Sequence, residues 1–253
     1  MVKTETIDIN ADIQVLLKQF KLPDIHARYD EEIQAAIANK LSYREFLYKL
    51  LKVEEGGKIE RLRLRNIKNA HFNDLKTMDD FDFSYPDSIN QGKVQDLATL
   101  SFMDKKENIV FIGPPGVGKS HLVQAIGLKA CEHGKTVLFV NAIDLMDDLH
   151  NARLEGTLKQ RLFKLSKINL MIIDELGYLK MDKEKESIFF QLIRQRYEKS
   201  SLIITTNLTF NRWDEVFTSE LAATAILDRL LHHSHVISIT GDSYRVKRHL
   251  EEE

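Results

Sequence analysis

Apolar residues recur at helical spacing through the first 75 residues of the chain. Ser42 and Glu45 precede the third apolar group with the spacing of a capping box, in which each residue satisfies a backbone amide near the other. The pattern therefore predicts an all-helical N-terminal domain over residues 1–75. The three apolar groups are Ile13, Leu16, Leu17 and Phe20; Ile33, Ala36 and Ile37; and Phe46, Leu47, Leu50, Leu51 and Val53.

The pattern changes twice after this region. Between residues 76 and 107 Asp and Ser become frequent, Tyr85-Pro86 interrupts any helix, and the range is interpreted as a connector over the next domain. From residue 108 to 253, short β-branched runs alternate with helical stretches, which is typical of a parallel sheet buried on both faces. An α/β domain with a five-stranded parallel sheet is predicted, its strands at 109–112, 136–140, 170–173, 202–205 and 236–239.

Composition narrows the class of protein. The 253 residues are 43% hydrophobic and carry 36 basic against 38 acidic residues, so contact with nucleic acid would have to come from local patches. The single cysteine, Cys131, excludes an intrachain disulfide and is expected to be a buried structural thiol. The N-terminus has no apolar signal-peptide core and no apolar run is long enough to span a membrane, so a cytoplasmic protein without membrane contact is expected.

A glycine-rich segment follows the first predicted strand and precedes a helix, the position that phosphate binding requires. Its glycines let the backbone approach phosphates, and the amides at the helix N-terminus point at the anion. Lys119 would reach the β- and γ-phosphates of ATP, and the Ser120 hydroxyl would bind Mg²⁺. The alternative is a glycine-rich turn without a ligand. The predicted cofactor-binding residues are Gly113, Pro114, Pro115, Gly116, Val117, Gly118, Lys119, Ser120 and His121.

Two further strand ends carry candidate catalytic groups. Asp174 and Glu175 follow the run at 170–173, where Asp174 would hold Mg²⁺ and Glu175 would act as general base on the attacking water. Asn207 follows the run at 202–205 and could orient that water. A solvated acidic turn and a helix-capping asparagine are the alternatives.

Together the segments GPPGVGKS, IIDE and TTN resemble a AAA+ ATPase core. The runs TNLTFNRWDEVF, AILDRLLHHSHVISI and GDSYR extend this resemblance to the IstB-type transposition helper proteins, relatives of DnaC-type helicase loaders, over nearly the whole chain. The resemblance implies that Arg229 is an arginine finger for a neighbouring subunit and that Arg245 is a sensor-2-like contact to the γ-phosphate. Arg229 could equally be a helix-surface arginine paired with a carboxylate.

The histidines next to Arg229, His232, His233 and His235, raise the question of a metal site. No cysteine or carboxylate within the same run completes a ligand set, so packing and hydrogen bonding are the favoured interpretation.

Two basic segments are candidates for DNA contact, with solvated helix faces as the alternative. The first lies at residues 58–68 and the second in the insertion from Asn141 to Lys167, which in proteins resembling helicase loaders lines a DNA channel. Neither carries a base-reading motif, so contact with double-stranded DNA is expected to be largely independent of sequence. The candidates are Lys58, Arg61, Arg63, Arg65 and Lys68, and Arg153, Lys159, Arg161, Lys164 and Lys167.

The leading hypothesis is an ATPase, with ATP and Mg²⁺ as cofactors, that forms homo-oligomers on DNA with ATP at subunit interfaces. It would recruit or stimulate an IstA-like transposase and disassemble on hydrolysis. A replicative helicase loader is the second hypothesis. A metabolic P-loop kinase is disfavoured by Glu175, Asn207 and Arg229, and a non-catalytic nucleotide-gated scaffold would require Glu175 to be dispensable.

Overall fold

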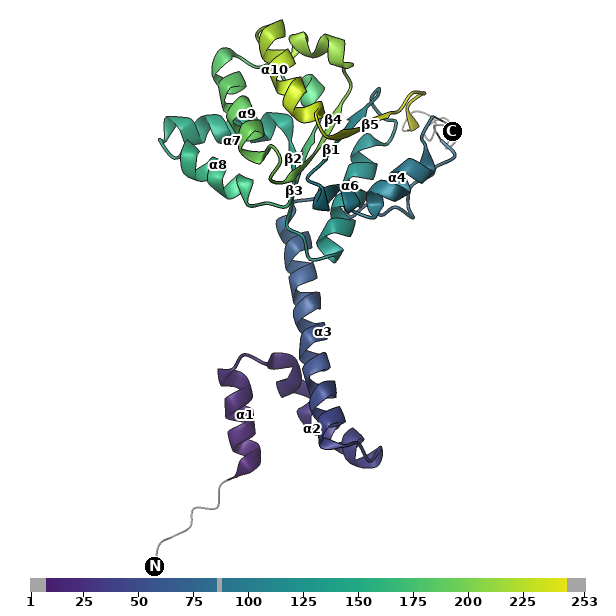
Figure 1. Ribbon diagram of the computed structural model, residues 1–253, viewed down its shortest axis with the longest axis vertical. Coiled ribbons are helices and arrows are strands. Elements are labelled where there is room, and N and C mark those ends of the chain that lie inside the picture. The colour runs from purple at the N-terminus through teal and green to yellow at the C-terminus, as the bar shows by residue number, and fades with distance from the viewer. Residues whose placement is uncertain (1–7, 86–87, 245–253) are drawn as a thin grey trace, which may run out of the picture. The chain divides into compact units, whose positions relative to one another are not determined.

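The computed structural model describes residues 8–85 and 88–244 (Figure 1). The chain divides into two compact units, Met1–Leu64 and Arg65–Glu253, with the boundary inside a long helix.

The N-terminal unit is helical, as its apolar spacing predicts. Helix α1 spans Ile9–Gln19, α2 spans Pro23–Ala38 and α3 runs over Tyr43–Asn69. The predicted capping box is confirmed, because Ser42 N donates to Glu45 Oε2 at 2.8 Å and Glu45 N to Ser42 Oγ at 3.4 Å. The hydrogen bonds from Ser42 lower the pKa of the Glu45 carboxyl. A sequence signal of a few residues therefore fixes the start of the longest helix.

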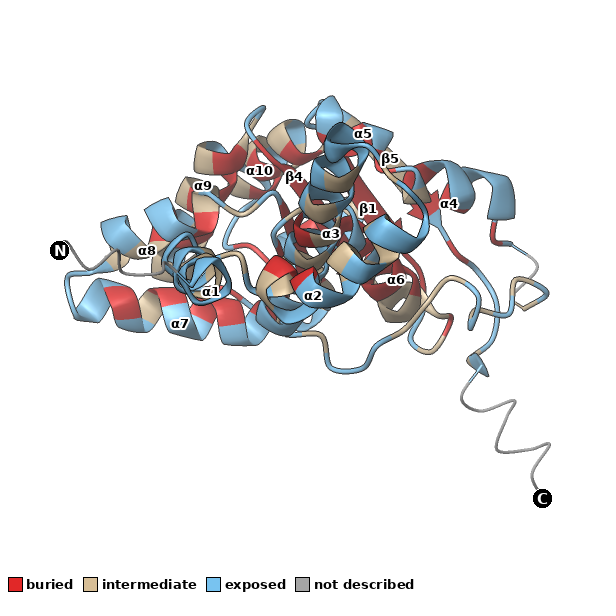
Figure 2. Ribbon diagram, turned by 90° about the horizontal axis from the view of Figure 1, so that it is seen from below, coloured by how far each residue is buried: buried red, intermediate tan, exposed pale blue. Residues whose placement is uncertain are grey.

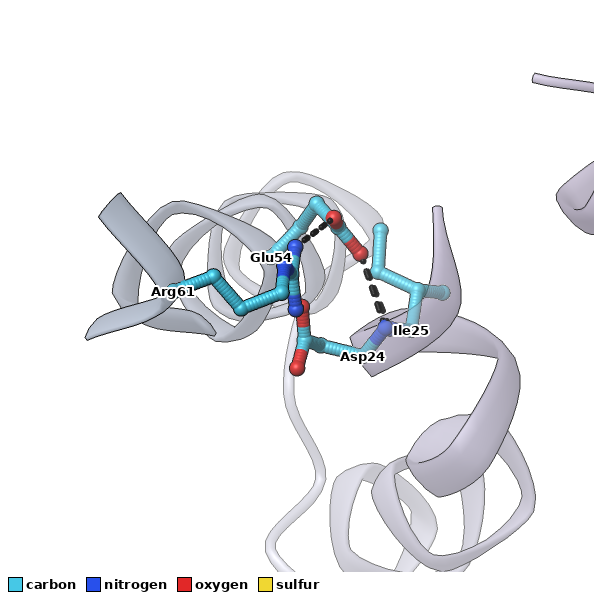
Figure 3. Close-up of polar contacts among 4 residues, drawn as sticks. All are labelled: Asp24, Ile25, Glu54 and Arg61. Atoms are coloured by element: carbon cyan, nitrogen blue, oxygen red, sulfur yellow. Dashed lines mark hydrogen bonds and ion pairs between the residues drawn. The ribbon is translucent and has the colours of Figure 1, made fainter. Parts of the chain in front are cut away.

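A buried carboxylate at the middle of α3 holds the start of α2. Glu54, only 3% exposed, accepts hydrogen bonds from the backbone amides of Asp24 and Ile25 at 3.0 and 3.2 Å (Figure 3). Arg61, one of the basic candidates, donates to Glu54 at 3.1 Å and also pairs with Asp24. Since α2 begins with Pro23 and its N-cap Leu22 has no capping side chain, Glu54 supplies the cap from another helix.

The range predicted as a connector contains two short helices, α4 (Gln91–Ala98) and α5 (Ser101–Asp104). Asn90 caps α4 by accepting from the amide of Lys93 at 2.9 Å. Val94, Leu97 and Phe102 are buried in the same apolar core as the first strand. Such short helices display too little of the helical repeat to stand out in the sequence.

The predicted parallel five-stranded sheet is confirmed, with strand order β2-β3-β4-β1-β5. Alternate residues of β3 face opposite cores: Met171 and Ile173 belong to one apolar cluster, and Leu170 and Ile172 to the other. Burial on both faces explains why these strands are continuous apolar runs. The strands are β1 (Asn108–Ile112), β2 (Val137–Asn141), β3 (Leu170–Asp174), β4 (Ser201–Thr206) and β5 (Ser234–Ser238).

Helices cover both faces of the sheet. Helices α7 to α10 lie on one side and α4 and α6 on the other (Figure 1), with buried residues facing inward and exposed residues outward (Figure 2). Cys131 is fully buried in α6, and burial raises the pKa of its thiol to about 12, in agreement with a structural role. Within the described ranges, none of the helices combines the length and apolar character needed to cross a membrane. Besides α4, the helices that cover the sheet are α6 (Lys119–Glu132), α7 (Ala142–Leu154), α8 (Leu158–Ser166), α9 (Lys183–Arg196) and α10 (Glu220–Leu231). Two short 3₁₀ segments, η1 (Leu176–Tyr178) and η2 (Phe210–Glu215), are also present among the described residues.

Candidate nucleotide-binding site

The glycine-rich segment forms a loop between β1 and α6, in the context that its sequence predicts. Gly116 and Gly118 have φ of +83° and +92°, a left-handed conformation that favours glycine. A Cβ at Gly113 would lie 2.2 Å from the carbonyl oxygen of Ile239, and one at Gly116 would lie 2.0 Å from Ser243 Oγ. The loop is therefore built for glycine by both conformation and space.

The charged and hydroxyl groups of this loop point into its concave side. Lys119 Nζ donates to the carbonyl oxygens of Gly113 and Pro114, each at 2.7 Å. Ser120 Oγ donates to Asp174 Oδ1 at 3.0 Å. The predicted metal-binding pair, Ser120 and Asp174, is thus brought together from positions far apart in the sequence.

Glu175 is held by two residues whose contacts the sequence did not reveal. Its backbone adopts a left-handed conformation with φ of +63°, and its amide donates to Thr205 Oγ1 at 2.8 Å. Its carboxylate accepts from Asn141 Nδ2 at 3.0 Å. Thr205 also donates to Asp174. Asn141 and Thr205 lie at the carboxyl ends of β2 and β4. Because parallel strands end at the same edge of a sheet, these positions could have indicated contacts with the site.

The amide of Asn207 lies at the same edge. Its Oδ1 is buried and has no hydrogen-bond partner among the described residues. A Cβ at Gly177 would lie 2.0 Å from this oxygen, so only glycine allows η1 to pass so close to Asn207. A buried acceptor without a partner at a pocket wall is suited to a ligand or an ordered water.

These side chains surround an open pocket of about 1330 Å³. Among the predicted residues, the pocket is lined by those from Pro115 to His121 and by Asp174, Glu175 and Asn207. Gly113 and Pro114 do not line it, but their carbonyl oxygens accept hydrogen bonds from Lys119. His121 Nε2 lies 2.8 Å from the carbonyl oxygen of Thr77, and its ring packs edge-on against Phe81. The segment before β1 therefore forms one wall of the pocket.

The pocket fits a nucleoside triphosphate with a divalent cation. The two left-handed glycines leave the loop backbone accessible to phosphate oxygens. Hydroxyl and carboxylate oxygens, as in Ser120 and Asp174, are the ligand type that Mg²⁺ prefers. The Lys119 ammonium, at the mouth of the loop, supplies the positive charge that phosphates need.

Arg229 lies on α10 and does not line the pocket of its own chain. Its guanidinium stacks 4.6 Å from the centre of the Phe190 ring and donates to the Ala225 carbonyl oxygen at 2.7 Å. Arg245, the other predicted phosphate contact, lies outside the described residues.

The neighbouring histidines have protein partners. His232 Nδ1 lies 2.7 Å from the Tyr197 hydroxyl and His235 Nε2 lies 2.9 Å from Glu107. The fold also brings the Glu198 carboxylate within 4.8 Å of nitrogen atoms of His232 and His233, with all three side chains exposed. The carboxylate that the local sequence lacked is thus supplied by the turn that follows α9.

Several of the basic candidates are engaged in ion pairs. Arg61 pairs with Glu54 and Asp24, and Arg63 donates to Glu60 at 2.7 and 2.8 Å. In the insertion, Arg153 pairs with Glu184 at 2.8 Å and Arg161 with Asp148 at 2.7 Å. Lys167 lies 4.7 Å from the Phe163 ring centre. Within the described part of the chain, the exposed candidates for which neither an ion pair nor a ring contact is seen are Lys58, Arg65, Lys68, Lys159 and Lys164.

Comparison with known proteins agrees with this geometry. A protein of insertion sequence IS21 from Pseudomonas aeruginosa, named as ATP-binding, is 41% identical over 236 residues, covering 93% of this chain and 89% of its own length. The corresponding protein of IS232 from Bacillus thuringiensis subsp. berliner is 42% identical, covering 94% of this chain and 95% of its own.

Solved structures share the fold at lower identity. AMPPCP-bound DnaA from Aquifex aeolicus superposes with a TM-score of 0.56 at 21% identity, over 72% of this chain and 56% of that one. The structure of DnaI gives a TM-score of 0.54 at 20% identity, over 66% and 89% respectively. These matches identify the P-loop AAA+ fold. The model of the family described as IstB-like ATP binding protein matches residues 15–252, and the chain therefore belongs to that family.

Proposed function

We propose that this protein binds ATP with Mg²⁺, hydrolyses it, and acts as the ATP-dependent helper of a transposase on double-stranded DNA. The observation that carries the proposal is the convergence of Lys119, Ser120, Asp174, Glu175 and Asn207 on one pocket. The family's description as ATP binding and the insertion-sequence origin of its relatives support it.

The chemistry follows from the position of each side chain. Lys119 exchanges the loop carbonyls for the β- and γ-phosphates, and Ser120 and Asp174 hold Mg²⁺, which neutralises developing phosphate charge when bound. Glu175 accepts a proton from the attacking water, and Asn207 Oδ1, buried and without a partner among the described residues, orients that water. Hydrolysis of ATP is favoured over transfer of its phosphate to a small molecule, because Glu175 and Asn207, the proposed base and water-orienting amide, line the same pocket.

Arg229 is proposed to act on the nucleotide of a neighbouring copy. A guanidinium stabilises charge on the transferring phosphoryl group, and Arg229 lies away from the pocket of its own chain. The proposed function therefore includes a homo-oligomer with ATP at the subunit interfaces. When this oligomer forms, Arg229 leaves its contacts with Phe190 and the Ala225 carbonyl oxygen. Arg245 stays a proposed γ-phosphate contact.

DNA contact is proposed to use exposed basic side chains without reading bases. Lys58, Arg65 and Lys68 are exposed on α3, and Lys159 and Lys164 are exposed on α8. In this proposal residues 1–75 bind DNA or a protein partner and residues 108–253 form the ATPase domain. Residues 76–107 connect these two regions. The client is an IstA-like transposase, and the site of action is the cytoplasm.

Steady-state ATP hydrolysis tests the proposal directly. The wild-type protein should hydrolyse ATP slowly and faster with long duplex DNA. Lys119→Ala should abolish binding of a fluorescent ATP analogue, because the loop loses its positive charge. Lys135, which pairs with Asp104 away from the pocket, provides a matched control, since Lys135→Ala should leave both binding and hydrolysis unchanged. Affinity equal to wild type in the Lys119 variant would overturn the assignment of the site.

A further inference from the structure

The hydroxyl of Thr205 connects the two acids of the site. Thr205, on β4, is fully buried. Its Oγ1 donates to Asp174 Oδ1 and accepts from the Glu175 backbone amide at 2.8 Å. A hydroxyl has one hydrogen to donate, and the amide can only donate, so the direction of both bonds is fixed.

The first bond sets the position of the Asp174 carboxylate. Oδ1 of Asp174 accepts from Ser120 at 3.0 Å and from Thr205, so the carboxylate is held between the phosphate loop and β4. Without the Thr205 hydroxyl, the side chain could turn away from Ser120, and the two oxygens proposed to hold Mg²⁺ would lose their fixed separation.

The second bond holds the backbone of Glu175. The φ of +63° is unfavourable for a residue with a side chain, so a surrounding contact must maintain it. The hydrogen bond from the Glu175 amide to Thr205 is such a contact, and Asn141 adds a second through the carboxylate. The direction in which Glu175 leaves the strand therefore depends on Thr205.

We propose that Thr205 is a positioning residue of the ATPase site, which orients Asp174 for the metal and Glu175 for the attacking water. The inference rests on the function proposed above and deepens it. The two residues before it on β4, Ile203 and Ile204, are buried apolar β-branched residues. Valine, with the same shape as threonine, would satisfy packing alone, whereas the Thr205 hydroxyl uses both its donor and its acceptor capacity on the two acids of the site.

The test compares Thr205→Val, which keeps the shape, with Thr205→Ser, which keeps the hydroxyl. Ser201→Ala is the matched control, because Ser201 is a buried hydroxyl on the same strand whose Oγ has no partner among the described residues. Affinity for Mn²⁺ in the complex with a non-hydrolysable ATP analogue is measured by electron paramagnetic resonance. Turnover is measured separately as a function of Mg²⁺ concentration.

Thr205→Val should bind the analogue without metal as wild type does but bind Mn²⁺ about 10–100-fold more weakly, as expected for a partner of a metal ligand. Turnover should fall by at least tenfold, and Thr205→Ser and Ser201→Ala should stay near wild type. If Thr205→Val does not fold, Thr205→Ala removes the same hydroxyl without adding volume.

Unchanged Mn²⁺ affinity in the folded Val or Ala variant would overturn the proposal. A Ser variant as impaired as the Val variant would also overturn it, because the methyl group would then be responsible. A wild-type protein that binds Mn²⁺ tightly without hydrolysing ATP would instead refute the proposed hydrolysis, while the metal measurement would still decide the role of Thr205.

Discussion

Asn141 joins the carboxylate of Glu175 to the first turn of α7. Its Nδ2 donates to Glu175 Oε2 at 3.0 Å, while its Oδ1 caps α7 by accepting from the Ile143 amide at 2.9 Å. This contact ties the Glu175 carboxylate to the end of β2, so it competes with the approach of the same carboxylate to an attacking water. Asn141 is therefore expected to restrain hydrolysis.

Asn141→Ser separates the two contacts, because serine caps helices well but is too short to reach Glu175. The variant should hydrolyse ATP severalfold faster without DNA and show a smaller stimulation by DNA. Its unfolding midpoint should stay close to that of wild type because the cap is kept. Steady-state rates with and without duplex DNA, beside a thermal melt, give the measurement. An unchanged ratio of the two rates would rule out restraint by Asn141.

Glu175→Gln should retain ATP binding and lose turnover. The amide has nearly the shape of the carboxylate but cannot accept the proton, and a general base contributes about 10²–10⁴-fold. Asn141 Nδ2 can still donate to the remaining side-chain oxygen, so the local structure should persist. The variant should also stay on DNA longer than wild type. Hydrolysis within about twofold of wild type would show that Glu175 is not the base.

The N-terminal unit should depend on Glu54 far more than on its neighbours. Glu54→Ala leaves the amides of Asp24 and Ile25 without their cap, which should cost roughly 2 kcal/mol of stability in that unit. Glu55→Ala is the matched control, because Glu55 is exposed and, among the described residues, forms an ion pair with Lys52 alone. Hydrogen exchange read by mass spectrometry should show faster exchange at residues 24–25 in the first variant alone. Equal exchange in both variants would contradict the capping role.

The sequence predicted the parts of the molecule that depend on local patterns. The strands were recognisable because burial on both faces requires continuous apolar runs, and the phosphate loop because all its residues belong to one short segment of the chain. The contacts of Thr205, Asn141 and Glu54 were not recognisable, since each joins residues that only the fold brings together. The same reason hid the pairing of Arg61 with Asp24, which turns a candidate DNA contact into part of a helix cap.

Arg229→Ala should bind ATP normally and lose hydrolysis, because the guanidinium is proposed to act on a neighbouring copy. Mixing this variant with Lys119→Ala creates some interfaces with an intact phosphate loop on one side and an intact Arg229 on the other. Partial activity should therefore return, at most about a quarter of the wild-type rate for random mixing of pairs. With mixed oligomers verified by native mass spectrometry, absence of any recovery would contradict action between subunits.

DNA contact along α3 is expected to depend on its exposed basic side chains. Lys58, Arg65 and Lys68 are exposed on α3, whereas Arg61 holds Glu54 and Asp24. Replacing these three exposed residues with alanine should weaken duplex binding and lower the salt dependence by about three units in slope per subunit. The estimate follows from roughly 0.9 units for each phosphate that a basic side chain no longer neutralises.

Arg63→Ala provides the control on the same helix, because the Arg63 guanidinium is already paired with Glu60. The slope of the salt dependence should therefore change in this variant by less than the effect of one neutralised phosphate. Anisotropy from about 50 to 200 mM salt, on duplexes of several lengths, gives the measurement. ATP should tighten binding to long duplexes more than to short ones, since each subunit that assembles along the DNA brings further basic side chains to the backbone. An unchanged slope in the triple variant would move the DNA-binding surface to Lys159 and Lys164 on α8, and a length-independent affinity would favour a small fixed oligomer over assembly along the duplex.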